Sequence, residues 1–193
     1  MIKAIIFDFY GVLVTEKLIT FKETHFKTPE EKEKINDLLD ELNMNQISRV
    51  DFRTRLAEMA GMTLEQINDM LGKNEPNEKL LDYIKNELKP RYKLGIISNA
   101  PNDSILKYLR PGDELIFDYI LVSGDFGYIK PEPEIYEEAL KQLGVNPGEA
   151  VFIDDIVRYC NGAERVGIKA INYKSFDQTV AVLKDTLSAN LDD

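Results

Sequence analysis

Four segments of the chain place polar side chains where an apolar run ends or a helix begins. These side chains are Asp8, Ser98, Asn99, Lys130, Asp154 and Asp155. A carboxylate at the end of a buried strand can act as a nucleophile or as a metal ligand. Hydroxyl, amide and ammonium groups can hold the oxygens of an anion. Together, these residue types could bind an oxyanion beside a divalent cation.

The acidic positions carry the clearest chemical signal. Asp8 ends one apolar run and precedes Gly11, and the adjacent Asp154 and Asp155 end another. Adjacent carboxylates repel each other unless a cation or hydrogen bonds hold them. Oxygen ligands without histidine or cysteine favour Mg²⁺ over zinc. Each acidic position, taken alone, is also compatible with an exposed turn.

The remaining polar positions could bind an anion. Ser98 and Asn99 end a further apolar run, and Lys130 lies just before Pro131 and a predicted helix. A lysine held at the start of such a helix can place a fixed positive charge near an anion. The alternatives are an ordinary turn for Ser98 and Asn99 and a solvent-exposed position for Lys130. The combination is informative because these side chains come at successive strand ends.

Composition excludes several classes of function. The chain has 193 residues, 44% of them hydrophobic and 30% charged, which is typical of one soluble domain or of one domain with an insertion. A net charge of −10 argues against nucleic acid as a partner. The single cysteine, Cys160, excludes an internal disulfide and a multi-thiolate zinc site. We find no membrane-spanning run and no signal peptide, so we expect a cytoplasmic monomer or homodimer with no membrane partner.

Five short apolar runs predict buried strands. They cover residues 2–7, 94–97, 119–122, 150–153 and 169–172. Helical patterns lie between them, including residues 133–143, which end at Gly144, and a last helix that begins near Ser175. Continuous apolar strands that alternate with helices indicate a doubly wound α/β fold with a parallel sheet. In such folds, ligands bind beyond the carboxyl ends of the strands.

The alternation breaks after the first strand. Residues 15–76 show helical patterns and no strand, with an N-cap and capping-box pattern at Thr28, and a helix over 77–88 returns the chain to the sheet. A connection of this length is too long for a simple crossover, so it predicts a small helical bundle. We therefore divide the chain into a core of residues 1–14 and 77–193 and a helical cap of residues 15–76.

The polar segments resemble the four motifs of the haloacid dehalogenase-like superfamily of hydrolases. The matching segments are residues 5–13, 96–99, 130–131 and 152–155. The paired acids Asp154 and Asp155 are similar to subfamily I members that include sugar-phosphate phosphatases and the N-terminal phosphatase domain of epoxide hydrolases. The resemblance implies a Rossmann-like core with a small helical cap inserted after the first strand.

The resemblance further implies a Mg²⁺-dependent phosphatase that acts on a small phosphorylated substrate. Asp8 would attack phosphorus and form an aspartyl-phosphate. Mg²⁺ would be held by Asp8, the backbone carbonyl of Tyr10, Asp154 and Asp155. The metal would offset the repulsion between the attacking carboxylate and the phosphate.

The same resemblance implies how the phosphate is held. Ser98, the amide at Asn99 and Lys130 would bind the non-bridging oxygens, and Lys130 would act catalytically as charge develops on them. Tyr10 stands where most phosphatases of this superfamily carry an acid/base aspartate, and it would contact the substrate and could donate a proton to the leaving oxygen. The cap would close over the site, exclude water and read the leaving group.

Three positions depart from the usual phosphatase pattern. Tyr10 replaces the second aspartate of the first motif, Val12 replaces its threonine, and Tyr159 replaces an acid or amide of the fourth. A phenol with a pKa of about 10 is a poor general base at neutral pH. Haloacid dehalogenases of the same superfamily carry tyrosine at the Tyr10 position, so a metal-independent attack of Asp8 on carbon is one alternative.

A second alternative is a weakly active or inactive binding module that keeps the fold and the metal site. An ion pair from Arg158 to Asp154 or Asp155 would compete with Mg²⁺ and would favour this module. Thermal stabilisation by Mg²⁺ separates the alternatives, because dehalogenase chemistry needs no metal. The identity of the substrate depends on the cap side chains that face the site.

Overall fold

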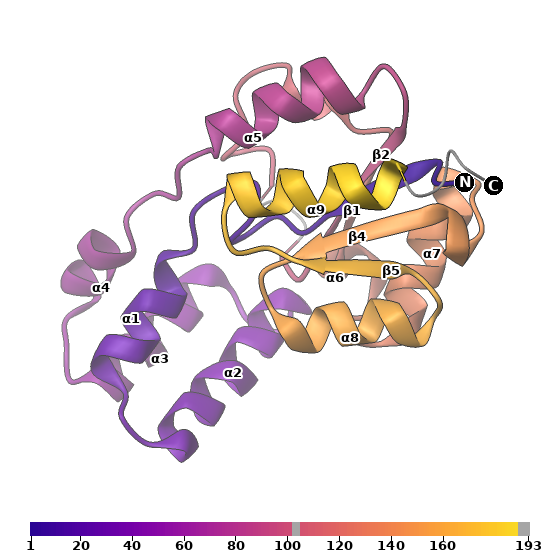
Figure 1. The fold of residues 1–193 in the computed structure, drawn as a ribbon. Helices are drawn as coiled ribbons and strands as arrows, with labels where there is room; N and C mark the ends of the chain where they lie inside the picture. Colours follow the sequence, from indigo (N-terminus) through magenta and orange to yellow (C-terminus); the bar gives the residue numbers. More distant parts are fainter. Residues whose placement is uncertain (102–104, 189–193) are drawn as a thin grey trace.

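The computed structural model describes residues 1–101 and 105–188, and these contain one five-stranded sheet. The strands are β1 (Ala4–Phe7), β2 (Lys93–Ser98), β3 (Tyr119–Val122), β4 (Ala150–Asp154) and β5 (Lys169–Asn172). All neighbours are parallel, in the order β3-β2-β1-β4-β5. The doubly wound α/β fold expected from the sequence is confirmed, with β1 at the centre of the sheet (Figure 1).

The side chains of β1 alternate between the two faces of the sheet. Ile5 and Phe7 join one hydrophobic cluster, and Ala4 and Ile6 join another. Successive residues of a strand point to opposite faces, so a strand buried on both faces has a continuously apolar sequence. This burial fixes the register of β1, and the register in turn fixes where the polar residue that follows the strand is placed.

Helices cover both faces of the sheet (Figure 1). α5 (Glu78–Tyr83) and α9 (Phe176–Ser188) pack on one face, and α7 (Pro133–Leu143) and α8 (Val157–Arg165) pack on the other. Shorter helical segments are α6 (Ser123–Phe126) and the 3₁₀ turns Asp113–Ile116 and Pro147–Glu149. Within the described part of the chain, no helix has the length and apolar content required to span a membrane.

Helix boundaries mostly follow the signals in the sequence. α7 has the predicted bounds and ends at Gly144, whose φ of 62° is the left-handed conformation that closes many helices. The single helix expected over residues 77–88 is instead α5 followed by a π-helical turn, Ile84–Leu88. Lys89 donates to the carbonyl of Ile84 at 2.9 Å, which widens the turn by one residue. Apolar periodicity does not distinguish such a turn from the end of an α-helix.

The helical cap inserted after β1 has a hydrophobic core of its own (Figure 1). Its helices are α1 (Lys17–His25), α2 (Pro29–Asn43), α3 (Arg49–Ala60) and α4 (Leu64–Leu71). Thr28, Ser48 and Thr63 begin α2, α3 and α4 with capping boxes. The apolar faces of the four helices meet in a cluster that includes Phe21, Ile35, Phe52, Leu56 and Ile67.

Two chain segments connect the cap to the core, and they pair with each other. The N–H of Thr15 donates to the carbonyl of Glu75 at 2.9 Å, and the N–H of Asn77 donates to the carbonyl of Leu13 at 2.8 Å. The hydroxyl of Thr15 also accepts from the N–H of Glu75 at 2.9 Å. We propose that the cap comprises residues 15–76, because this hydrogen-bonded joint lies at the two ends of that segment.

The cap also contacts the core through α6. Asn45 donates from Nδ2 to the carbonyl of Gly124 at 2.9 Å, and the Ser123 hydroxyl donates to the carbonyl of Asn43 at 2.8 Å. Ser123 is fully buried, and its hydroxyl accepts from the N–H of Ala100 at 3.0 Å. The cap is therefore held at a covalent joint and at a second, non-covalent contact that includes two hydrogen bonds.

Candidate active site

Three carboxylates converge at one edge of the sheet. Asp8 directly follows β1, Asp154 is the last residue of β4, and Asp155 comes next. β1 and β4 are parallel neighbours, with Phe7 opposite Ile153, so their carboxyl ends lie at the same edge. Each carboxylate offers an oxygen within 4.8 Å of the other two. The structure therefore brings together the three acids that the sequence singled out.

A buried lysine lies between two of these carboxylates. The Nζ of Lys130 is 2.6 Å from Oδ1 of Asp8 and 2.7 Å from Oδ2 of Asp154. Burial alone lowers the pKa of Lys130, but the adjacent Asp154 and Asp8 raise it above its usual value, so the lysine is cationic. Among the described side chains of this cluster, one cation faces three acids.

Burial controls the charge state of Asp8. It raises the pKa of the Asp8 carboxyl well above its usual range, and the attraction of Lys130 offsets this shift in part. The nearby charges of Asp154 and Asp155 raise the pKa further. More positive charge beside Asp8 would favour the carboxylate form, which is the form that can attack an electrophile.

The carboxylate of Asp155 has an unmet capacity to accept hydrogen bonds. Its Oδ1 is buried and has no hydrogen-bond partner within the described residues. Burial raises the pKa of Asp155 to about 6, and the adjacent Asp154 adds to this shift. A buried polar atom without a partner costs about 1–3 kcal/mol. Such an oxygen, placed beside two other carboxylates, fits the role of a metal ligand.

Gly11 makes room for Asp155. The φ of Gly11 is 87°, in the left-handed region that glycine adopts without strain. A Cβ at this position would lie 2.5 Å from Oδ2 of Asp155. The turn after Asp8 therefore requires glycine on two grounds, the backbone conformation and the close approach of a carboxylate.

Ser98 provides a donor at the end of the next strand. It is the last residue of β2, which flanks β1 on the side opposite to β4. Ser98 is fully buried, and its hydroxyl lacks a hydrogen-bond partner within residues 1–101 and 105–188. An unsatisfied hydroxyl donor complements an anionic oxygen. An unsatisfied donor, Ser98, thus ends β2, and an unsatisfied acceptor, Asp155, directly follows β4.

The side chain of Asn99 holds the backbone of Lys130. Its Oδ1 accepts from the N–H of Lys130 at 2.7 Å, and its Nδ2 donates to the carbonyl of Lys130 at 3.0 Å. The side-chain amide is thus engaged with the protein, and the expected phosphate contact at this position concerns the backbone N–H. Asn99 positions the lysine by binding both its backbone N–H and its backbone carbonyl.

Tyr159 covers the lysine from α8. The Nζ of Lys130 lies 4.9 Å from the centre of the Tyr159 ring, within the range of a cation–π contact. The Tyr159 hydroxyl accepts from Nδ2 of Asn99 at 3.3 Å. Tyr136, which is fully buried, donates its hydroxyl to the carbonyl of Tyr159 at 2.9 Å. The tyrosine that replaces the usual acid of the fourth motif therefore supports Lys130.

Tyr10 both faces the site and packs against other aromatic rings. It lines the cavity in front of Asp8. Its ring meets the ring of Phe9 edge-on at 5.0 Å and that of Tyr108 at 6.1 Å, measured between centroids. Val12 is buried in the core, so an apolar contact replaces the usual hydroxyl of the first motif.

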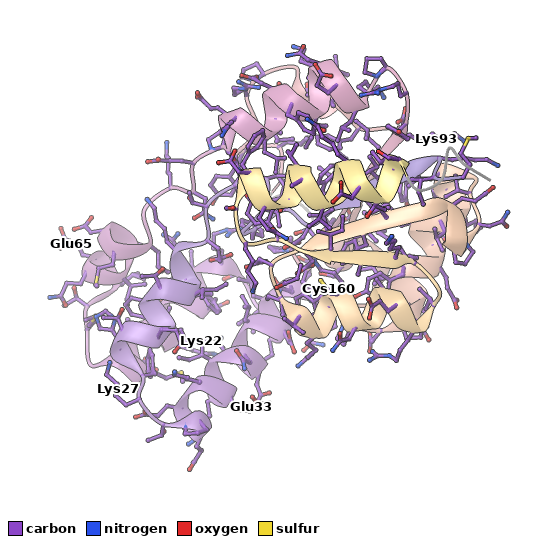
Figure 2. All side chains as sticks on the ribbon, viewed as in Figure 1. Lys22, Lys27, Glu33, Glu65, Lys93 and Cys160 are labelled. Carbon is purple, nitrogen blue, oxygen red and sulfur yellow. The ribbon has the colours of Figure 1, made fainter. Side chains whose placement is uncertain are left out.

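A cavity of about 360 Å³ lies between the cap and the carboxylate edge of the core. Its core side includes Asp8, Tyr10, Asn99, Lys130 and Tyr159. The charged residues on its cap side are Glu16, Lys17, Lys22, Glu23, Arg49 and Arg53. Figure 2 shows Lys22 between α1 and α2, whereas Lys27 lies toward the outer end of the cap. A cavity of this size holds a small molecule.

Glu16 is a site residue that the sequence reasoning missed. It lines the cavity and caps α1 by accepting from the N–H of Leu18 at 2.9 Å. Burial raises its pKa to about 7, against the effect of that hydrogen bond, and the charge of Asp155 contributes to the rise. An acid placed directly before a helix was a visible capping signal, but its burial against the cavity depends on the cap.

The cation beside the acidic pair is Lys130 rather than Arg158. The guanidinium of Arg158 lies 5.7 Å from the centre of the Tyr159 ring, and within the described residues it makes no ion pair with Asp154 or Asp155. The ion pair that would have favoured an inactive module is therefore not formed.

Cys160 is buried, and burial raises the pKa of its thiol to about 11.

The chain belongs to the haloacid dehalogenase-like hydrolases. The family model of that description matches residues 5–173, which include all four polar segments. The resemblance expected from the sequence motifs is thus confirmed, and the protein is a hydrolase of this family.

The similar curated proteins include phosphatases. The D-ribitol-5-phosphate phosphatase of Bacteroides thetaiotaomicron is 29% identical over 175 residues, which cover 80% of this chain and 84% of the relative. The phosphorylated carbohydrates phosphatase of Thermotoga maritima is 26% identical over 188 residues, which cover 88% of this chain and 83% of the relative. Both of these relatives, which match most of this chain, are named as phosphatases.

Solved structures of the family share the fold. A HAD family enzyme of Bacteroides thetaiotaomicron in complex with magnesium and inorganic phosphate is 26% identical, with a TM-score of 0.68 and coverage of 91% of this chain and 96% of that one. A 2-haloacid dehalogenase of Pseudomonas syringae is 22% identical, with a TM-score of 0.58 and coverage of 92% and 90%. At that identity, the dehalogenase shows a common fold alone.

Proposed function

We propose that the protein is a Mg²⁺-dependent phosphatase that hydrolyses the ester of a small phosphorylated molecule through an aspartyl-phosphate on Asp8. The observation that carries the proposal is the convergence of Asp8, Asp154 and Asp155 beside Lys130, in front of a cavity. A metal-bound carboxylate with a cation and hydroxyl donors around it is suited to phosphoryl transfer.

The acids fit a magnesium ion. Asp8, Asp154 and Asp155 would supply carboxylate oxygens, and the backbone carbonyl of Tyr10 a fourth oxygen. The unsatisfied Oδ1 of Asp155 is the feature that supports this assignment directly. When bound, the ion supplies the positive charge that lets a carboxylate approach an anionic phosphate. The magnesium and phosphate in the similar Bacteroides enzyme support the same choice of ion.

Asp8 carries the covalent step. Its carboxylate oxygen forms a bond to phosphorus while the ester oxygen leaves and takes a proton. Ser98, the N–H of Asn99 and Lys130 would hold the non-bridging oxygens during this step. Water then attacks the phosphorus of the aspartyl-phosphate, which releases inorganic phosphate and returns Asp8.

The tyrosine two positions after the nucleophile sets a limit on the reaction. Tyr10 faces the cavity and can donate a proton to a leaving oxygen, but it is a weak base at neutral pH. We therefore expect faster turnover for esters whose leaving group needs no proton, such as aryl phosphates, than for alkyl phosphates.

Hydrolysis of p-nitrophenyl phosphate with and without Mg²⁺ tests the proposal. We expect activity that depends on Mg²⁺ and that falls at least about a thousandfold in Asp8→Asn, which has the same shape but is not a nucleophile. Circular dichroism of the variant controls for folding. Metal-independent activity, or wild-type activity in Asp8→Asn, would overturn the aspartyl-phosphate mechanism.

Dehalogenase chemistry is a second candidate, because Tyr10 faces the cavity and Arg49 and Arg53 line its cap side. A guanidinium could bind the carboxylate of a haloacid. Halide release from 2-chloropropionate without metal, together with no hydrolysis of aryl phosphate, would replace the phosphatase proposal. The absence of both activities, with Mg²⁺-dependent thermal stabilisation retained, would instead indicate a binding module.

A further inference from the structure

The cap side of the cavity is rich in cations, although the chain as a whole has a net charge of −10. Four basic residues of the cap line it, namely Lys17, Lys22, Arg49 and Arg53. Lys17 Nζ lies near Gly72, the C-cap of α4, where the carbonyl end of a helix favours a positive charge. The charge of the cavity wall therefore differs in sign from the average charge of the chain.

Two of these cations are held by neutral groups. Lys22 donates from Nζ to Oδ1 of Asn36 at 2.7 Å, and Arg53 donates from Nη1 to Oδ1 of Asn68 at 2.6 Å. An amide oxygen orients a cation but does not neutralise its charge. Lys22 and Arg53 are thus fixed in position while their charges remain available to a ligand.

Other cations of the cap have a different arrangement. Arg55 lies on the same helix as Arg53 but pairs with Glu41 at 3.0 Å and does not line the cavity. Lys34 pairs with Glu30 in the same manner. Arg53, which lines the cavity, thus has an amide partner, whereas Arg55, two residues further along the helix and outside the cavity lining, has an acidic partner.

The acids of the cavity wall do not cancel this charge. Glu23 is engaged by Lys32, which lies outside the cavity lining. Burial raises the pKa of Glu16 to about 7, so Glu16 is partly protonated at neutral pH. The charged groups that face Glu16 are Asp155 and Lys22. The charges of Lys22 and Arg53 therefore remain available when a phosphate occupies Asp8 and Lys130.

We propose that Lys22 and Arg53 bind a second anionic group, a carboxylate or a phosphate, of a substrate whose phosphate ester lies at Asp8. The inference rests on the proposed function, and it defines the substrate class as small phosphorylated acids or bisphosphates. The guanidinium of Arg53 has further N–H donors beside the one bound to Asn68, and its planar fork matches either anion. The cavity, at about 360 Å³, limits the substrate to a small molecule.

Three matched phosphate esters test the inference. They are 2-hydroxyethyl phosphate, 2-phosphoglycolate and ethylene glycol bisphosphate, which differ at the far end by a hydroxyl, a carboxylate and a phosphate. We expect kcat/KM at least about tenfold higher for the anionic esters than for the hydroxyl ester, with the difference mainly in KM. Whichever of the two anionic esters is preferred identifies the second group.

The variants Arg53→Met and Lys22→Met should each reduce that ratio by about tenfold, because each loses a charge-assisted hydrogen bond. Arg55→Met is the matched control, since it removes the same charge from the same helix outside the cavity, and it should leave the ratio as it is. Equal kcat/KM for the three esters in the wild-type protein would overturn the inference, as would an equal loss of the ratio in Arg55→Met.

Binding separates this inference from the proposed function. Calorimetric titration of Asp8→Asn with the three esters in the presence of Mg²⁺ requires no hydrolysis. Asp8→Asn should bind the anionic esters more tightly than the hydroxyl ester, and the double variant Asp8→Asn, Arg53→Met should lose this difference. That result would support the subsite even if the wild-type protein hydrolysed none of the esters. Hydrolysis of all three esters with equal affinities would refute the subsite and leave the phosphatase standing.

Discussion

The two sides of the cavity hold their cations in opposite ways. On the core side, Lys130 is fully buried and bonded to the carboxylates of Asp8 and Asp154. On the cap side, Lys22 and Arg53 are partly exposed and bonded to amide oxygens. A buried ion pair is rigid and depends on both partners, whereas a cation held by an amide can exchange its partner for a ligand. The core side is thus suited to catalysis of one reaction, and the cap side to selection of the substrate.

Removal of the charge should have its largest effect on the core side. Lys130→Met leaves two buried carboxylates without their cation, so we expect a loss of about 3–5 kcal/mol in the free energy of unfolding and a fall of at least about a hundredfold in hydrolysis. Lys22→Met, the same change on the cap side, should cost less than about 1 kcal/mol. Urea denaturation of both variants measures the difference. Equal losses would show that the two sides do not differ as described.

The pH dependence of stability should reveal Glu16, a buried acid on the cap side of the cavity. The pKa of Glu16 rises from 4.5 in its usual setting to about 7 in the fold, so the folded state favours the protonated form. The contribution of Glu16 to the free energy of unfolding of the metal-free protein should therefore be fully present below pH 4.5 and be lost as the pH rises to about 7. The shift in pKa corresponds to at most about 3.5 kcal/mol. Asp155 acts in the same direction, up to a pH of about 6.

Glu16→Gln keeps a side-chain oxygen for the cap of α1 but removes the titration. Urea denaturation at several pH values should give a flatter profile for this variant than for the wild-type protein above pH 6. A profile that stays as steep would mean that the buried acid responsible is another one.

The support of Lys130 should matter for rate more than for binding. Asn99→Ala frees the backbone N–H and carbonyl of Lys130, so we expect kcat to fall by about 10–100-fold with a small change in KM. Tyr159→Phe is the control, because it keeps the ring over the ammonium group and loses one hydroxyl that accepts at 3.3 Å. Steady-state kinetics would argue against this positioning role if the two variants behaved alike.

The smallest expected effect concerns the contact of the cap with α6. Asn45 has a φ of 55°, which glycine also adopts, so Asn45→Gly removes the bond to Gly124 without forcing a new backbone conformation. We expect a change of less than about 1 kcal/mol in unfolding. Thermal denaturation measures it. A larger loss would mean that the cap is anchored at this contact and not mainly at its covalent joint.

The core side of the site could be predicted from the sequence to a large extent. Asp8, Ser98 and Asp154 end apolar runs, and parallel strands bring the ends of such runs to one edge. Lys130 could be placed near them through the motif that it resembles. The path of the backbone places each of these residues, and hydrophobic periodicity in the sequence predicts that path.

The partners of individual side chains could not be predicted in this way. The side-chain amide of Asn99 binds the backbone N–H and carbonyl of Lys130, and the Tyr159 ring covers the ammonium group of Lys130. These contacts form because α8 and the segment before α7 meet in the folded chain. The burial of Glu16 and the amide partner of Arg53 arise from the packing of the cap helices. These features depend on side-chain directions and on tertiary contacts, which the spacing of residues in the sequence does not predict.

The hydroxyl of Ser123 is shared between the cap and the core. It carries one proton but has two carbonyl acceptors within reach, Asn43 of the cap at 2.8 Å and Ala100 of the core at 3.2 Å. Rotation about a single Cβ–Oγ bond can transfer the donation from one acceptor to the other. If the cap swings away, the Ser123 hydroxyl can donate to Ala100 in the core, and the Asn43 carbonyl at the end of α2 loses its donor. Departure of the cap then breaks the hydrogen bonds of Asn43 with Ser123 and of Asn45 with Gly124, and the Ser123 hydroxyl keeps a partner in the core.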